Sequence, residues 1–175
     1  VGWCVADAES AGLFKPASEW QGTERQSHSY GYGYSVTALQ LAAAVNTVAN
    51  GGVYVAPKLV EAVIGADGEV TDTPAAATHQ VIQPATAATM TDMMKGVVCE
   101  GTGKGAQIPG ISVAGKTGTA YKVQDDNTYG AAGTRAYRAS FVGYFPADAP
   151  RVTILVTIDE PDPTSNDRFG GKAAA

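Results

Sequence analysis

The stretch Gly110–Ala120, GISVAGKTGTA, fits two patterns that require different local structures. Residues 110–117 fit G-x-x-x-x-G-K-[ST], a loop in which a strand delivers the chain and the lysine then opens a helix. Residues 116–118 also form a K-T-G triplet, which requires that the chain continue as a strand. The residues on either side of Lys116 separate the two interpretations.

The flanking residues favour a strand. Before Gly110 stands GTGKGAQIP, which is typical of a loop and not of a buried strand. After Thr117 the chain continues GTAY, and glycine and β-branched threonine are poor helix formers. The apolar run VTILVTIDE looks like the acidic strand of a phosphate-loop enzyme, but the short PADAP connection before it predicts an antiparallel neighbour. We therefore reject a nucleotide-binding loop and predict a strand over residues 111–121.

Strand patterns dominate the last third of the chain and recur upstream. Residues 138–146 and 151–160 join 111–121 as strand candidates, and a polar excursion over 122–135 separates the first two. Upstream, VYVAPKLVEAVI (53–64) is rich in β-branched residues and predicts a strand. Asp67-Gly68 predicts a hairpin turn, and residues 71–80 are predicted to be a surface loop.

Two helices are predicted between these strands. Thr37 and Gln40 form a T-x-x-Q capping box, and the first helix ends at the glycines after Asn50. Pro84 opens a second helix, which is predicted to run to about Val98. The residues predicted to face the core are Leu41, Ala44, Val45 and Val48 in the first helix, and Met90, Met93, Met94 and Val97 in the second. Together these elements predict an α+β fold in which helices flank an antiparallel sheet.

The first 34 residues show no sustained period and are predicted to be loop-rich. They end in SHSYGYGYS, whose alternation puts Tyr30, Tyr32 and Tyr34 on one side if the segment is extended. Such a segment could line a cleft, and the pattern fits a packed aromatic loop equally well.

Composition limits the class of protein. The chain has 175 residues, of which 45% are hydrophobic and 17% charged, and its net charge is −5, which indicates a globular protein. No cluster of basic residues offsets the acidity, so we expect no nucleic-acid partner. No apolar run reaches the roughly 18 residues of a membrane span, and no signal peptide is found within these 175 residues, as expected if targeting signals lie upstream.

The cysteines and histidines do not suggest a metal site. Cys4 and Cys99 lack C-x-x-C spacing, and His28 and His79 are not placed as ligands, so we predict neither a metal nor a cofactor. We interpret the two cysteines as buried free thiols; the alternative is a single disulfide in an oxidising compartment.

Several motifs in order carry a family resemblance. The segment VAGKTGTA, preceded by GVVCEGTGKGAQIPG and followed by ASFVGYFPADAPRVTILVTIDEP, resembles the transpeptidase domain of class B penicillin-binding proteins. SYGYGYSVTALQLAAAVNTVANGG resembles the same family at the matching place, and RFGGKAAA resembles the start of its closing segment. The resemblance runs from about Ala11 to the last residue. It implies a serine β-lactamase/transpeptidase-like fold, of which residues 1–175 would form the C-terminal portion of one domain.

The resemblance also assigns roles to the K-T-G-T residues. Lys116 would line the catalytic cleft and support proton transfer, and the Thr117 and Thr119 hydroxyls would bind the carboxylate of a donor peptide or a β-lactam. The Thr119 backbone N–H would be one oxyanion-hole donor. Gly118 would leave room for the helix that carries the catalytic serine. Tyr30 and Tyr32 are candidates for the border of the cleft.

The nucleophile of such an enzyme is missing from this sequence. No serine is followed by lysine three places on, or by asparagine two places on, so S-x-x-K and S-x-N are both absent. Because the chain also opens on Val1, we expect a portion cut at both ends and inactive by itself. The alternative is a non-catalytic module that senses or binds β-lactams or muropeptides.

The resemblance finally implies partners and a location. A serine-type D,D-transpeptidase would act on peptidoglycan stem peptides, bind β-lactams covalently, and work at the outer face of the bacterial cytoplasmic membrane, held by an anchor outside this chain. A membrane glycan polymerase and division or elongation proteins are implied as further partners. The sequence does not choose between division and elongation.

Overall fold

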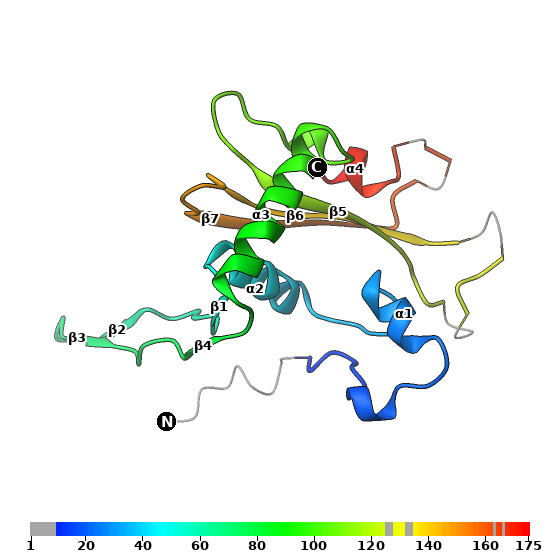
Figure 1. Cartoon of the computed structure of the whole chain (residues 1–175). Helices are drawn as coiled ribbons and strands as arrows, with labels where there is room; N and C mark the ends of the chain where they lie inside the picture. Colours follow the sequence, from blue (N-terminus) through cyan, green and yellow to red (C-terminus); the bar gives the residue numbers. More distant parts are fainter. Residues whose placement is uncertain (1–9, 125–127, 132–134, 163, 166) are drawn as a thin grey trace.

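The computed structural model describes residues 10–124, 128–131, 135–162, 164–165 and 167–175. Three separate sheets and several helices alternate along the chain (Figure 1). In chain order the elements are η2 (Ala17–Glu19), α1 (Glu24–Ser29), α2 (Ala38–Ala49), β1 (Val53–Val55), β2 (Ala62–Ile64), β3 (Val70–Asp72), β4 (Thr78–Gln80), α3 (Pro84–Cys99), η3 (Lys104–Ala106), β5 (Ala114–Tyr121), β6 (Tyr137–Phe145), β7 (Val152–Asp159) and α4 (Gly170–Ala173).

The main sheet has the strand order β5-β6-β7 and is antiparallel throughout. The predicted strand containing Lys116 is confirmed as β5, whose register opposes Lys116 to Val142 and Gly118 to Ser140. The residues after Lys116 thus form a strand and not a helix, which confirms the rejection of a phosphate-binding loop. The predicted α+β class with an antiparallel sheet flanked by helices is confirmed as well.

Helices cover the two faces of this sheet differently. On one face Tyr144, which is fully buried, packs with Ala114 and with Met94 of α3, and α2 adds Val45 and Val48. On the other face Phe141 packs with Val98, Val113 and Ala174, the last of which directly follows α4. Because Met94 and Val98 belong to opposite clusters, α3 passes beside the N-terminal end of β5 and closes the core there (Figure 1).

The bounds predicted for the two long helices are confirmed, but some of the residues predicted to face the core do not. In α2 the capping box is present, since Gln40 N–H donates to Thr37 Oγ1 (3.1 Å) and Thr37 N–H donates to Gln40 Oε1 (2.9 Å). Val45 and Val48 pack against the core as predicted, whereas Ala44 is exposed.

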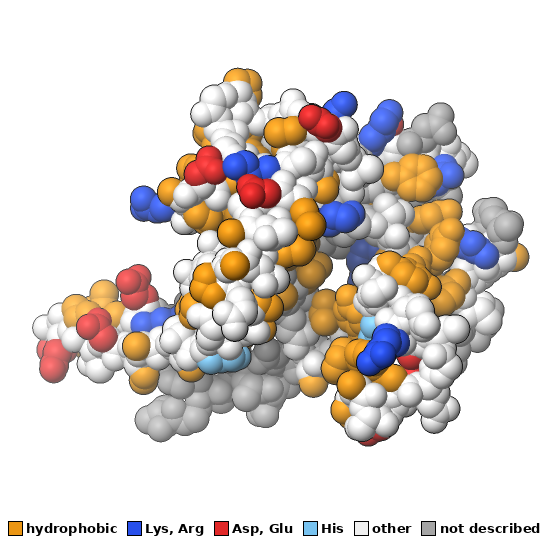
Figure 2. All heavy atoms as spheres, in the orientation of Figure 1, with side chains coloured by type: hydrophobic (Ala, Val, Ile, Leu, Met, Phe, Trp, Pro, Cys, Tyr) orange, Lys and Arg blue, Asp and Glu red, His pale blue; other side chains and the backbone are white. Residues whose placement is uncertain are grey.

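In α3 the predicted apolar face is confirmed at Met94, which is buried, and wrong at Met90 and Met93. Met90 is 39% exposed and Met93 61% exposed, and hydrophobic side chains are visible on the surface over α3 in Figure 2. The buried residues are Ala87, Met94 and Val98, and Thr91 lies on the same stripe at helical spacing. The sequence pattern did not reveal this stripe because it contains a polar residue, Thr91. Its Oγ1 pairs with the buried Tyr144 hydroxyl at 2.7 Å.

The upstream strand prediction is partly wrong. Residues 53–64 form two short strands, β1 and β2, and not one, because Pro57 lies between them and has no N–H to donate to a ladder. β2 and β3 form the predicted hairpin around Asp67-Gly68, closed by Gly68 N–H donating to the Gly65 carbonyl (2.9 Å). The predicted loop 71–80 instead contains most of β3 and all of β4, and β4 pairs with β1.

The cysteine prediction is wrong at one position and lies outside the described residues at the other. Cys99 is a free thiol, as predicted, but it is exposed at the end of α3 and not buried. Cys4 is not among the described residues. Within the part of the chain that the structure describes, no helix is both long and apolar enough to cross a membrane.

Candidate active site at the free edge of β5

The K-T-G-T residues lie on an edge strand. Only β6 pairs with β5 among the described strands, so the opposite edge of β5 has no strand partner. Lys116 and Thr119 are exposed, and Thr117 and Gly118 are half-buried. A strand with an unpaired edge offers its N–H and C=O groups to an extended peptide, so this edge can bind one as an additional strand.

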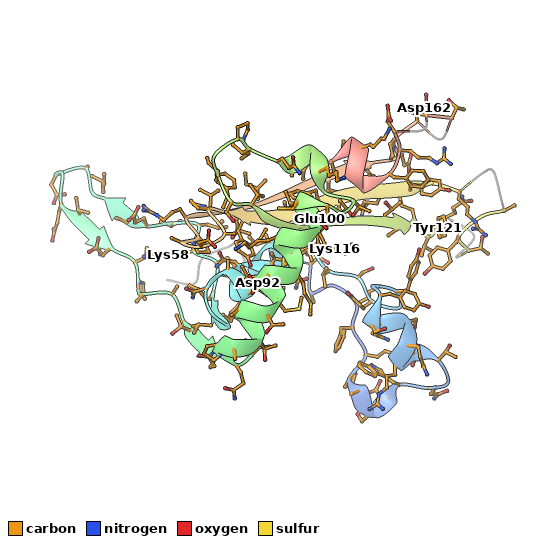
Figure 3. The ribbon with its side chains drawn as sticks, turned by 45° about the horizontal axis from the view of Figure 1, so that its top comes forward. Lys58, Asp92, Glu100, Lys116, Tyr121 and Asp162 are labelled. Atoms are coloured by element: carbon orange, nitrogen blue, oxygen red, sulfur yellow. The ribbon has the colours of Figure 1, made fainter. Side chains whose placement is uncertain are left out.

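The predicted site side chains leave β5 on opposite faces. Because side chains alternate along a strand, Lys116 and Gly118 share the face covered by α2 and α3, and Thr117 and Thr119 share the face covered by α4. Figure 3 shows Lys116 near the middle of β5 and close to α3. A single ligand that contacts all of these residues must therefore lie along the free edge and not above either face.

Lys116 is already oriented by its own strand. Its Nζ donates a hydrogen bond to the backbone carbonyl of Thr117 at 2.7 Å. The side chain is exposed, and no carboxylate forms an ion pair with it among the described residues. The ammonium group is consequently available to an anionic or proton-accepting ligand at the edge.

The two threonine hydroxyls each have a partner behind the strand. Thr117 Oγ1 pairs with Thr102 Oγ1 at 2.7 Å, and Thr102 comes from the turn between α3 and η3. Thr119 Oγ1 accepts a hydrogen bond from the backbone N–H of Gly170 at 3.1 Å, where α4 begins. An oxygen that accepts from behind keeps its own proton to donate, and a carboxylate is an acceptor. The arrangement therefore suits an anion bound at the edge.

Gly118 lies close to a neighbouring side chain, as its place within a strand predicts. A β-carbon at position 118 would lie 2.5 Å from Ser140 Oγ on the neighbouring strand. On the other face, a β-carbon at Gly170 would collide with the backbone carbonyl of Gly118. The groups close to Gly118 in this chain are thus Ser140 and the start of α4.

Aromatic rings continue the site beyond the end of β5. Tyr121, which Figure 3 places at the far end of the strand, lies 6.3 Å from the ring of Tyr129, and Tyr129 lies 6.0 Å from Tyr32. Tyr30 packs edge-on against Tyr32 at 5.7 Å. In Figure 2 hydrophobic side chains gather above α1, where this end of the sheet lies. Arg135 lies 4.7 Å over the ring of Tyr121.

Tyr30, Tyr32 and Tyr34 do not form one extended row. Gly31 and Gly33 have φ angles of +95° and +87°, which turn the chain between the rings. Tyr32 turns toward β5 through Tyr129, whereas Tyr34 stacks on His28 at 5.7 Å. Tyr34 therefore belongs to a packed aromatic loop, which was one of the two interpretations of the sequence. Tyr32 instead reaches the border of the candidate site.

An ion-pair cluster fixes the same end of the sheet. Lys122 Nζ donates to Glu160 at 2.6 Å and to Asp159 at 2.9 Å, and Arg138 also bonds Asp159. Hydrogen bonds to Glu160 and Asp159 raise the pKa of Lys122, and the hydrogen bond from Lys122 lowers the pKa of Asp159. This cluster is structural: the lysine charge is engaged with carboxylates and does not serve the edge.

Three contributors to the site escaped the sequence analysis. Thr102, Ser140 and Gly170 lie 14 to 54 positions from Lys116 along the chain, and no periodicity links them to it. Only the α3–η3 turn, the strand register and the position of α4 bring them to β5. Among the described residues, no group of three or more His, Cys, Asp or Glu side chains could hold a metal ion.

Comparisons with known proteins identify the family of the chain. The family described as penicillin binding protein transpeptidase domain matches residues 5–175. The chain is 37% identical over 173 residues to penicillin-binding protein PbpB of Mycolicibacterium smegmatis, an alignment that covers 95% of this chain and 26% of that protein. It is 33% identical over 168 residues to peptidoglycan D,D-transpeptidase FtsI of Escherichia coli, with 95% and 26% covered.

A solved structure gives the same result. Penicillin binding protein 3 from Mycobacterium tuberculosis, crystallised in complex with aztreonam, matches with a TM-score of 0.79 and 34% identity, over 87% of this chain and 35% of that chain. The chain thus spans about a quarter of the length of the curated relatives it matches. Family match, sequence identity and fold agree, and the chain belongs to the transpeptidase domain family of class B penicillin-binding proteins.

Proposed function

We propose that this chain supplies the substrate-binding strand of a serine-type D,D-transpeptidase that cross-links peptidoglycan stem peptides. The observation that carries the proposal is the unpaired edge of β5, where Lys116 and Thr119 are exposed and the Thr119 hydroxyl, which accepts from the Gly170 N–H, keeps its proton to donate. Relatives named as peptidoglycan D,D-transpeptidases support the reaction class. Residues 1–175 would be the C-terminal portion of one transpeptidase domain, and the activity would belong to the intact protein.

In this proposal β5 aligns the donor stem peptide as an added strand. The Thr117 and Thr119 hydroxyls donate to the terminal carboxylate of the peptide, and the Thr119 backbone N–H stabilises the oxyanion that forms when the serine attacks. Lys116 supports the carboxylate charge and the proton transfers near the serine. A β-lactam carries a carboxylate and an acyl group in a similar arrangement, so it would be captured by the same edge.

The remaining parts of the proposal concern the intact protein. The serine would come from an S-x-x-K motif outside these 175 residues, so the chain by itself would be inactive. The site of action would be the bacterial cell envelope, at the outer face of the cytoplasmic membrane. Peptidoglycan stem peptides and β-lactams are the proposed ligands, and a membrane glycan polymerase with division or elongation proteins are the proposed partners.

The test is covalent labelling of the intact protein with a fluorescent penicillin. We expect a labelled band that survives denaturing electrophoresis and is lost in Lys116→Ala. Lys58→Ala is a matched control, because Lys58 lies far along the chain in the β1–β2 connection and its Nζ bonds only the Thr73 carbonyl in the described contacts. An intact protein that takes up no label while carrying its S-x-x-K motif contradicts the proposal.

The same experiment separates the proposal from a non-catalytic sensor. A sensor module would bind penicillin reversibly, so the fluorescence would comigrate with native protein but disappear on denaturation. That outcome would retain β5 as a binding edge while removing the acyl-transfer reaction. Complete absence of binding, both native and denatured, would remove both functions.

A further inference from the structure

The hydroxyl pair Thr102–Thr117 joins the edge strand to a turn that the proposed function does not use. Thr102 Oγ1 lies 2.7 Å from Thr117 Oγ1, and the two residues are 15 positions apart. No other hydrogen bond of the Thr102 side chain is found among the described residues. Thr102 is an exposed residue of this turn, and its hydroxyl can act on a ligand of Thr117 through the bond between the two hydroxyls.

The turn that carries Thr102 is held on both sides. Gly101 N–H donates to the Gly96 carbonyl (3.1 Å), and Gly103 N–H donates to the Val97 carbonyl (3.0 Å), so the turn is bonded to the last turns of α3. On the other side the backbone of Gly171 in α4 packs directly against the Thr102 carbonyl. The backbone of Thr102 is therefore fixed, and its hydroxyl is held at one place beside Thr117.

A pair of hydroxyls has two orientations of its hydrogen bond, and a carboxylate ligand selects one of them. A carboxylate only accepts, so a Thr117 hydroxyl that binds it must donate its single proton outward. The Thr117 oxygen can then only accept from Thr102, which produces the chain Thr102 O–H to Thr117 O–H to carboxylate. Each bond in such a chain polarises the next and strengthens it.

Thr119 uses the same arrangement with a different donor. Its oxygen accepts from the backbone N–H of Gly170, which cannot reverse its direction. Thr102 plays the corresponding part for Thr117 through a side chain, and it can therefore be removed by substitution. Without it, the Thr117 hydroxyl loses the group that orients its proton toward the edge.

We propose that Thr102 is a positioning residue, which orients the Thr117 hydroxyl to bind the carboxylate of the donor peptide or β-lactam. This inference rests on the proposed transpeptidase function. Thr102 acts through Thr117 and is not itself a catalytic residue. It adds a residue from the α3–η3 turn to a site that the motif assigns to β5 alone.

The test measures acylation rates of the intact protein by intact-protein mass spectrometry. The probes are benzylpenicillin and its methyl ester, which lacks the carboxylate charge. With benzylpenicillin, Thr102→Val is expected to lower the second-order acylation rate constant about 3- to 10-fold, the effect of one neutral hydrogen bond. With the methyl ester the rate constant is expected to stay unchanged, and Thr102→Ser is expected to restore the rate with benzylpenicillin.

Coupling to Thr117 provides the second readout. If Thr102 acts through Thr117, the double variant Thr102→Val/Thr117→Val acylates no more slowly than Thr117→Val alone. Thr89→Val is the matched control, because Thr89 is exposed on α3 and bonds only the Ala85 carbonyl in the described contacts. It is expected to leave both rates unchanged.

Three results would overturn the inference: Thr102→Val acylating like the wild type, an equal loss with both probes, or additive losses in the double variant. Thermal melting of each variant shows whether a slower acylation is caused by misfolding. If Thr102→Val misfolds, the acylation rates of Thr102→Ser, which keeps the hydroxyl, with the two probes decide whether the inference holds. Failure of the wild type itself to be acylated would instead refute the proposed function. The two failures are therefore distinguishable.

Discussion

The threonines of the K-T-G-T motif depend on groups that the motif does not contain. Thr117 is bonded by Thr102, and Thr119 by the amide of Gly170. The Gly170 contact uses a lone pair of the Thr119 oxygen and leaves its proton to donate, and the Thr102 contact does the same for Thr117 when Thr102 is the donor of the pair. The chemical character of this edge thus follows from the packing of the α3–η3 turn and α4 behind β5.

Thr119→Ala tests the value of one such donor. Because a hydrogen bond to a charged acceptor contributes about 1.5–3 kcal/mol, acylation of the intact protein by benzylpenicillin is expected to slow about 10- to 100-fold. The measurement is the second-order acylation rate constant. Thr71→Ala removes an exposed strand threonine from the β2–β3 hairpin and is expected to have no effect. Equal rates for the two variants would show that Thr119 does not bind the carboxylate.

Tyr144 gives a prediction about pH. Burial raises the pKa of its phenol, which favours the neutral form in the folded state. The associated stability is present below the unfolded pKa of about 10 and is lost as the pH rises above it. Tyr144→Phe is expected to lower the free energy of unfolding by about 1 kcal/mol near neutrality and to flatten the alkaline decline.

The measurement for Tyr144 is denaturant unfolding of the intact protein between pH 7 and about pH 11. Tyr30→Phe, at an exposed tyrosine, is the control and should follow the wild type throughout. The loss in Tyr144→Phe is limited because Thr91 keeps its bond to the Ala87 carbonyl and is not left without a partner. An alkaline decline as steep as that of the wild type would contradict the assignment.

Sequence reasoning at the residue scale reached the residues of the motif and the tyrosines near them, but not the groups that pack against β5. Lys116, Thr117, Gly118 and Thr119 stand together in the chain, so a pattern finds them. Thr102 and Gly170 reach the strand only through tertiary packing, and a glycine that contributes its backbone N–H has no side chain to suggest the role. Their contribution could not be predicted without coordinates.

At the scale of elements, the start of α4 is the most closely fitted contact of the site. A β-carbon at Gly170 would collide with the Gly118 carbonyl and lie 2.6 Å from the Ser140 carbonyl, and both are backbone atoms that cannot rotate away. The helix can approach the sheet only because this residue is glycine. That approach also brings the Gly170 N–H to Thr119.

Gly170→Ala is therefore expected to push α4 away from the sheet. The free energy of unfolding should fall by about 1–3 kcal/mol, the usual effect of overpacking, and penicillin acylation should slow because Thr119 loses its donor. Gly96→Ala in α3 is the matched control: nothing lies within 4 Å of a β-carbon there, and better helix propensity should raise stability by about 0.5–1 kcal/mol. The stabilities of the two variants are measured by denaturant unfolding. A Gly170→Ala variant as stable as Gly96→Ala would contradict the packing argument.

Elements with a strong local signal were predicted best. The capping box located α2, Pro84 located α3, and β-branched runs located the three strands of the main sheet. The buried face of α3 was missed because Thr91 occupies it and pairs with Tyr144 from β6. Short strands such as β4 were missed because their residues are polar and exposed, and pairing with β1 alone defines them.

Two apolar surfaces of the described chain bear on how the whole molecule behaves in solution. On β7 the side chains of Val152, Ile154 and Val156 are exposed along one face, and β7 has no second strand partner among the described residues. Between α2 and the β1–β4 pair, an apolar groove of about 420 Å³ is lined by residues including Leu39, Val81 and Ile82. The unpaired edge of β7, together with its exposed β-branched side chains, favours association between molecules.

We predict that the 175-residue chain studied alone self-associates. Sedimentation velocity is expected to show oligomers, and Ile154→Lys is expected to reduce them because it places a charge on the β7 edge. Thr71→Lys is the control: it makes the same change in the net charge of −5 at an exposed hairpin position. A soluble monomer with a sharp cooperative melt would contradict the prediction.

Sequence reasoning at this scale identified the family and the α+β class, because ordered motifs spread over the whole chain are specific. It could not predict which face of the main sheet is covered by α2, α3 or α4, or where the aromatic rings around Tyr121 lie. Those features follow from how the three-stranded sheet is covered, which depends on contacts far apart in sequence.

The most direct test of the central claim, that the free edge of β5 binds the anionic group of the ligand, is a crystal structure of the intact protein acylated by benzylpenicillin. We predict that the carboxylate lies along this edge, with its oxygens about 2.6–3.2 Å from Thr119 Oγ1 and Thr117 Oγ1. Thr117 should remain bonded to Thr102, and Thr119 to Gly170. A covalent adduct whose carboxylate contacts neither threonine would contradict the account.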